Sequence, residues 1–102
     1  MKMFLISDNL DTKIGMRLAG IEGVVVHEKD EVLDMLTKAL KDIDIGLILI
    51  TEKLADLVQN ELYRMKLTYQ TPLIIEIPDR HGSKKAVDAI THYVREAIGL
   101  KI

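Results

Sequence analysis

The sequence has no cysteine and no tryptophan, and only two prolines interrupt its 102 residues. The lack of cysteine excludes disulfide bonds, thiolate catalysis and zinc sites with cysteine ligands. Folding at this length hides about two-thirds of the surface of the extended chain, which is sufficient for a stable core without a metal or disulfide staple. We therefore expect a single packed domain that needs no cofactor.

The sequence also lacks an excess of charge of either sign and any long apolar run. Its 14 basic and 16 acidic residues give a formal net charge of -2, so no positive field attracts a phosphate backbone. The longest apolar runs, such as Leu47–Ile50, fall far short of the roughly 20 residues of a membrane-spanning helix. Met1–Ser7 is too short for a signal peptide. We expect a cytoplasmic protein that binds no nucleic acid and meets a membrane only indirectly.

Short runs rich in β-branched residues have the length of strands and alternate with helical patterns. The predicted strands are Met3–Ile6, Val24–Val26, Ile45–Ile50 and Leu73–Ile77. In the first helical pattern Ile14 and Leu18 share one face, polar residues of the segment 7–12 can start the helix, and Gly20 and Gly23 follow its end. The second pattern begins at Asp30 and repeats apolar residues every three or four positions: Val32, Leu33, Leu36, Ala39, Leu40 and Ile43.

The third and fourth helical patterns follow the last two predicted strands. Thr51 can cap one continuous helix, predicted to be the longest, which ends before Thr71–Pro72 and aligns Leu54, Val58, Leu62 and Met65. A loop from Pro78 to Ser83 precedes the last helix, whose apolar stripe comprises Ala86, Val87, Ile90, Val94, Ala97 and Ile98.

Strict alternation of strands and helices requires parallel strands joined by right-handed crossovers. The sequence therefore predicts an α/β fold with a four-stranded parallel sheet in the order 2-1-3-4, receiver-like or Rossmann-like, with helices on both faces. We expect one structural domain, in which residues 1–78 form the sheet domain and residues 79–102 form a hinge loop and a C-terminal helix that can move.

The crevice beyond the carboxyl ends of the first and third strands is where such sheets bind ligands. Ser7, Asp8, Asn9, Thr51 and Glu52 are predicted to line it, and the two carboxylates disfavour a phosphate. The sequence has neither the Lys-Ser/Thr pair of a phosphate loop nor a Gly-x-Gly-x-x-Gly motif after the first strand. Asp8 and Glu52 could bind a lone divalent cation, but acids at helix N-termini more often act as caps and dipole partners. We expect no nucleotide site.

A phosphoacceptor domain would need a carboxylate at the end of the third strand. Thr51 holds that position, and Glu52 is already in the following helix. His27, His81 and His92 are scattered without metal-ligand spacing. We therefore predict no catalytic, cofactor or metal site, and no enzymatic activity.

Glu76 interrupts the fourth predicted strand, while Leu73, Ile75 and Ile77 keep the other face apolar. This pattern is typical of an edge strand with one wetter side. Glu76 either protects the edge or pairs with an arginine or lysine of a partner.

Four stretches, in this order and spacing, resemble the F subunit of V-type and A-type rotary ATPases. They are Gly15–Ile21, Gly46–Glu52, Pro72–Pro78 and Val94–Gly99. The resemblance implies a non-catalytic central-stalk subunit that binds the coiled-coil D subunit of the shaft and turns with it between the catalytic head and the membrane ring. It also implies a receiver-like fold without phosphorylation, a peripheral location through the complex, and a C-terminal helix that moves about a hinge, here Pro78 and Gly82.

The last helix carries more apolar residues than one sheet face requires, which suggests a second binding surface. We expect docking through Glu76 and through tail residues, namely Val87, Ile90, Tyr93, Val94, Ile98 and Leu100. The expected partners are the coiled-coil D subunit of the shaft and the catalytic head subunits, and the chain is not expected to be an obligate homo-oligomer. A six-residue hinge loop spans at most about 20 Å, which limits the reach of the helix.

The alternative function is a stand-alone receiver-like or nucleotide-sensing domain. Incubation with a phosphodonor and Mg²⁺ distinguishes the two, because only the alternative predicts a gain of mass. Co-purification with a coiled-coil subunit and catalytic subunits would instead support the stalk function.

Overall fold

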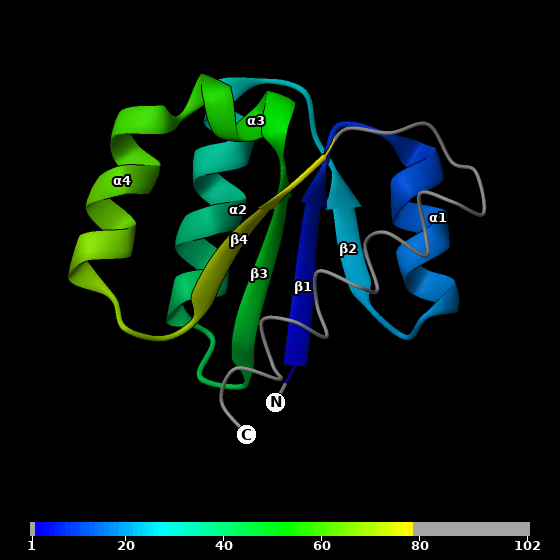
Figure 1. Ribbon diagram of the computed structural model, residues 1–102, viewed down its shortest axis with the longest axis horizontal. Helices are drawn as coiled ribbons and strands as arrows, with labels where there is room; N and C mark the ends of the chain where they lie inside the picture. The colour runs from blue at the N-terminus through cyan, green and yellow to red at the C-terminus, as the bar shows by residue number, and fades with distance from the viewer. Residues whose placement is uncertain (1, 79–102) are drawn as a thin grey trace.

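The structure is a computed structural model that describes residues 2–78 (Figure 1). Strands and helices alternate along the chain as predicted, with one extra helix. The elements are β1 (Lys2–Ser7), α1 (Leu10–Leu18), β2 (Glu22–Val25), α2 (Lys29–Lys41), β3 (Ile45–Thr51), α3 (Glu52–Leu57), α4 (Gln59–Thr68) and β4 (Leu73–Ile77).

The four strands form one parallel sheet in the order β2-β1-β3-β4, which confirms the predicted topology. Leu5 of β1 lies opposite Gly23 of β2 and Leu49 of β3. The order places β4 at one edge of the sheet, as the pattern around Glu76 predicted, and β2 at the other.

Helices pack against both faces of the sheet (Figure 1). The larger core lies under α2, α3 and α4 and comprises Ile6, Val26, Val32, Leu36, Ala39, Ile45, Ile48, Ile50, Leu54, Ala55, Val58, Leu62 and Ile74. The smaller core contains Met16 of α1 together with Leu5, Ile21, Leu47, Leu49 and Ile77. Alternate residues of β3 therefore enter different cores, and both cores are apolar.

The ends of α1 form as the sequence predicted. The Asn9 side chain accepts hydrogen bonds from the backbone N–H groups of Asp11 and Thr12 and so caps the first turn. At the other end, Gly20 adopts a φ of 85°, its N–H donates to the Arg17 carbonyl, and the Ile21 N–H donates to the Met16 carbonyl. This is the Schellman arrangement, in which glycine accepts the left-handed conformation without steric cost.

The predicted apolar face of α1 is not the face that is buried. Ile14 and Leu18 are 50% and 84% exposed, whereas Met16 is 2% exposed and packs on the sheet. Helical geometry separates residues two positions apart by about 200°, so burial of Met16 turns Ile14 and Leu18 to solvent. Ile43, expected on the buried stripe of the second helix, is 98% exposed because that helix ends at Lys41.

The single long helix predicted after Thr51 is also wrong, because the chain breaks into α3 and α4 at Val58. Val58 has φ −125° and ψ 30°, and its side chain is fully buried. A β-branched residue loses rotamer freedom in a helix, which makes it a suitable place for a break. Leu54, Val58 and Leu62 all stay buried on both sides of the break, so their spacing could not reveal it. The longest helix between residues 2 and 78 is therefore α2.

Gly23 provides a test of how closely β1 and β2 approach each other. A Cβ atom at this position would lie 2.7 Å from the Leu5 Cβ and 2.9 Å from the Leu5 carbonyl oxygen. We expect Gly23→Ala to lower the free energy of unfolding by about 1–3 kcal/mol in urea denaturation. Gly20→Asn is the control, because asparagine tolerates a positive φ and no atom lies within 4 Å of its Cβ position. Equal losses for both variants would contradict the close approach.

The N-terminus of α2 predicts a pH dependence of stability. Backbone N–H groups of Glu28 and His27 donate to Glu31 Oε1 at 3.1 and 3.3 Å, and these bonds lower the pKa of Glu31 below its usual 4.5. Since the folded-state pKa is lower than the unfolded one, this stabilisation is present above pH 4.5 and is lost as the pH falls through the folded-state pKa. We expect Glu31→Ala to be less stable than the native chain at pH 7, with the difference shrinking on acidification.

Glu31→Gln is the matched control for this measurement, because glutamine keeps an acceptor oxygen but cannot ionise. Thermal unfolding between about pH 3 and 7 should show no pH-dependent contribution from this position in Glu31→Gln. A Glu31→Ala difference that stays constant over that range would contradict the assignment.

Candidate functional site

The crevice at the carboxyl ends of β1 and β3 brings together Asp8 and Thr51, two of the residues predicted to line it. The Thr51 hydroxyl donates a hydrogen bond of 2.8 Å to Asp8 Oδ1. Thr51 is fully buried, and the Asp8 side chain is only 10% exposed. Thr51 occupies the N-cap position of α3, but its hydroxyl makes no cap hydrogen bond. Its bond to Asp8 instead ties the end of β3 to the residue that follows β1.

Lys53 also belongs to this crevice, and sequence reasoning missed it. Its Nζ lies 3.9 Å from Asp8 Oδ2, with the Lys53 side chain 72% exposed. The sequence signal that could have indicated Lys53 is its position in the first turn of the helix that follows the third strand. Lys53 partly compensates the charge of Asp8, so the expectation of two unopposed carboxylates was too simple. Glu52, the other expected carboxylate, is exposed in the same turn.

Ser7 and Asn9 use their polar groups within the chain. The Ser7 hydroxyl donates to the Asn9 carbonyl at 3.0 Å and accepts from the Asn9 N–H at 2.9 Å, and the Asn9 side chain caps α1. Within residues 2–78, every buried side-chain nitrogen or oxygen has a hydrogen-bond partner. No group of three histidine or acidic side chains gathers there as a metal site would require. The crevice groups therefore order the backbone and hold the two strand ends together.

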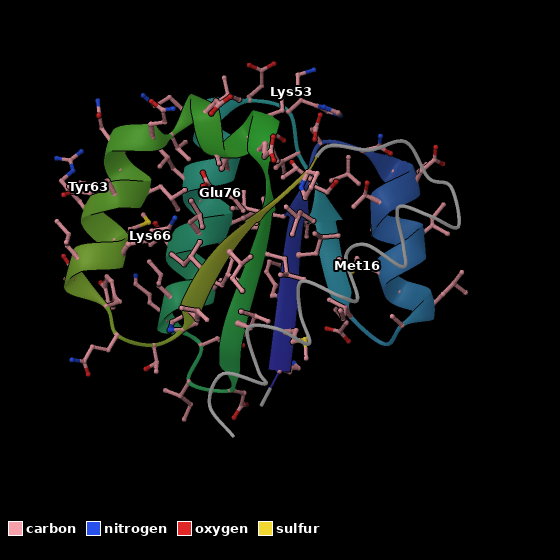
Figure 2. All side chains as sticks on the ribbon, in the orientation of Figure 1. Met16, Lys53, Tyr63, Lys66 and Glu76 are labelled. Carbon is pink, nitrogen blue, oxygen red and sulfur yellow. The ribbon has the colours of Figure 1, made fainter. Side chains whose placement is uncertain are left out.

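The fourth strand carries the one described residue that was predicted to dock a partner. Glu76 points to the side of the sheet where α4 lies, and its Oε2 is 3.9 Å from Lys66 Nζ (Figure 2). The two side chains are 44% and 40% exposed. Glu76 thus has a basic neighbour in its own chain, which the sequence pattern could not indicate, and remains accessible to solvent.

Pro78, one of the two predicted hinge residues, directly follows β4 and is half-buried. The other predicted hinge and docking residues lie outside the described part of the chain: Gly82, Val87, Ile90, Tyr93, Val94, Ile98 and Leu100. None of the helices between residues 2 and 78 has the length and apolar character needed to cross a bilayer.

Known proteins match most of this chain. The family model for the ATP synthase (F/14-kDa) subunit matches residues 3–94. The F subunit of the A-type ATP synthase of Thermococcus kodakarensis is 36% identical over 107 residues, covering 100% of this chain and 98% of the relative. The F subunit of Methanocaldococcus jannaschii is 31% identical over 103 residues, covering 100% and 99%. That of Pyrococcus furiosus is 37% identical over 109 residues, covering 100% and 98%.

A solved structure shares the fold. The F subunit of the V-type ATP synthase from Archaeoglobus fulgidus superposes with a TM-score of 0.62 at 20% identity, covering 74% of this chain and 95% of the other. This likeness confirms the fold. The family match and the relatives confirm the resemblance that Gly15–Ile21 and the other stretches indicated.

Replacing Thr51 by valine tests the role of the Thr51 hydroxyl in stability, because the two side chains have nearly the same shape. Thr51→Val removes the donor to the nearly buried Asp8 carboxylate, and we expect the free energy of unfolding to fall by about 1–3 kcal/mol. Thr37→Val is the matched control, since its hydroxyl bonds the Leu33 carbonyl on an exposed turn of α2, and it should change stability by no more than about 0.5 kcal/mol. Urea unfolding measures both, and equal effects would contradict a structural role for the Asp8–Thr51 bond.

Proposed function

The chain belongs to the ATP synthase (F/14-kDa) subunit family, and we propose that it acts as a non-catalytic central-stalk subunit that docks on the coiled-coil D subunit of the shaft. In this role it turns with the shaft and helps to couple ATP hydrolysis or synthesis to ion transport. Its location is the cytoplasmic side of the membrane, to which the complex attaches it peripherally. It also meets the catalytic head subunits and is not an obligate homo-oligomer.

The observation that supports a non-catalytic role is the bond between Thr51 and Asp8. At the position where a phosphoacceptor domain needs a free carboxylate, this chain has a hydroxyl that donates to the neighbouring acid. Asp8 also faces Lys53. Since the crevice groups bind one another, we expect the function to reside in surfaces that dock a partner.

The tail supplies one docking surface under this proposal. Fully burying one leucine, isoleucine or valine stabilises a complex by about 1.5–3 kcal/mol, so three such residues contribute about 5–9 kcal/mol. Association itself costs about 4–15 kcal/mol. The tail helix alone would therefore bind weakly, and a second surface on the sheet domain is needed.

The exposed side chains of residues 2–78 limit where that second surface can lie. The outer face of α2 shows no exposed large hydrophobic side chain. Such side chains gather on α1, at Leu10, Ile14 and Leu18, and around α4 and the start of β4, at Leu57, Tyr63, Leu67, Tyr69 and Leu73, while Ile43 stands alone in the turn after α2. The second docking surface is therefore sought on these two parts of the domain.

The contribution of the tail is tested by Ile90→Asp in a pull-down against the coiled-coil D subunit. Loss of one buried isoleucine should weaken binding by about 10-fold or more. His92→Asp is the control, because helical spacing puts His92 on the side opposite the predicted apolar stripe, and its variant should bind like the native chain. Circular dichroism verifies that both variants are folded. Undiminished binding by folded Ile90→Asp would contradict docking through the tail.

A further inference from the structure

Helix α4 buries little apolar surface against the rest of the domain. Leu62 is its one buried residue, whereas α2 buries Val32, Leu36 and Ala39. Met65 adds a partly buried side chain to the same core. Local opening of a folded chain is easiest where few apolar side chains are buried. Among the helices between residues 2 and 78, α4 meets this condition best.

The start of α4 lacks the side-chain caps found on α1 and α2. Val58 occupies its N-cap position and makes no side-chain hydrogen bond to the first turn. In contrast, Asn9 caps α1, and Glu28 forms a capping box with Glu31 on α2. Caps stabilise a helix, and isolated helices shorter than about 12 residues are marginal in water. At ten residues, α4 therefore depends on its neighbours for its helical form.

Two ion pairs connect α4 to its neighbours, one to a helix and one to a strand. Glu61 Oε2, in the first turn of α4, is 3.1 Å from Nζ of Lys29 at the start of α2. Its hydrogen bond with Lys29 lowers the pKa of Glu61 below the usual 4.5. Lys66 Nζ, in the last turn, is 3.9 Å from Glu76 Oε2 on β4 (Figure 2). The pairs thus tie α4 to both α2 and the edge strand.

The packing between α4 and β4 is incomplete. A surface hollow of about 340 Å³ lies between the two elements, and its lining includes Leu62, Lys66 and Glu76. Leu62 and Ile74 of β4 belong to the larger core and are 3% and 8% exposed. Movement of α4 away from the sheet would therefore uncover one end of this core. Val58, directly before α4, is fully buried in the same core and anchors the preceding chain.

We propose that α4 opens as a unit at Val58 while the sheet and the other helices stay folded, and that the two ion pairs hold it closed. The paired side chains are between 22% and 54% exposed, so dissolved salt weakens their attraction. The closed state then depends on ionic strength, and opening exposes the apolar surface around Leu62 and Ile74. Opening of α4 needs no partner and goes beyond the proposed function.

Amide hydrogen exchange of the full-length chain, measured by mass spectrometry on peptic fragments, detects this opening. Relative to unfolded-chain rates, amides of residues 62–69 should exchange about 10-fold or more faster than those of α2 and β3. Raising NaCl from about 0.1 to 1 M shortens the Debye length from about 10 to about 3 Å. This change should speed exchange in α4 about 2- to 5-fold and leave α2 and β3 nearly unchanged.

Charge reversal outside α4 tests the two ion pairs without altering the helix itself. Lys29→Glu on α2 and Glu76→Lys on β4 each place like charges together, and each should speed exchange in α4 about 3-fold or more. Glu61→Lys should then speed it at least about 3-fold less in the Lys29→Glu background than in the native chain, since that combination restores opposite charges. Asp34→Lys is the matched control, because its 3.1 Å pair with Lys38 lies within α2.

Three results would overturn the opening of α4 under control of its ion pairs. Equal exchange in α4, α2 and β3 would mean that α4 unfolds only with the whole domain. Fast exchange in α4 that responds neither to salt nor to Lys29→Glu and Glu76→Lys would mean that the ion pairs do not hold the helix closed. An equal response to Asp34→Lys would indicate a general charge effect. These measurements need no D subunit, so the proposed function would stand in each case.

Discussion

Burial of β3 on both of its faces is the constraint from which the layers of the domain follow. Ile48 and Ile50 enter the core beneath α2 and α3, while Leu47 and Leu49 enter the core that contains Met16 of α1. A strand buried on both sides must lie in the interior of a sheet, and parallel neighbours with crossover helices satisfy its backbone. The order β2-β1-β3-β4 places it there and leaves β4 at the edge.

The same strand also positions one of the two buried polar side chains of the crevice. β3 ends at Thr51, which is buried and donates its hydroxyl to Asp8 across 43 positions of sequence. The Asp8 and Thr51 side chains at this switch point of the sheet thus hold β1 and β3 together. Most of the exposed large apolar and aromatic side chains of residues 2–78 lie instead on the flanking helices and the edge strand.

Sequence patterns predicted the strands and their order well because buried β-branched runs between turn residues have few other interpretations. The predictions failed where tertiary packing, and not the local pattern, determined which side chain is buried or where a helix ends. Met16 rather than Ile14 faces the sheet, and Val58 ends a helix although its spacing suits one. The contacts of Asp8 with Lys53 and of Glu76 with Lys66 join separate elements, so no local pattern could indicate them. The tail residues favoured for docking stay predictions.

The break at Val58 has a mechanical consequence for α4. Val58 is fully buried, so the point at which α4 begins is fixed in the core, while the helix runs outward for ten residues, about 15 Å. A helix that is held at its start is displaced least near that start when it tilts, and most at its other end. Any tilt of α4 would therefore displace residues near its end, such as Leu67, more than residues near its start, such as Gln59.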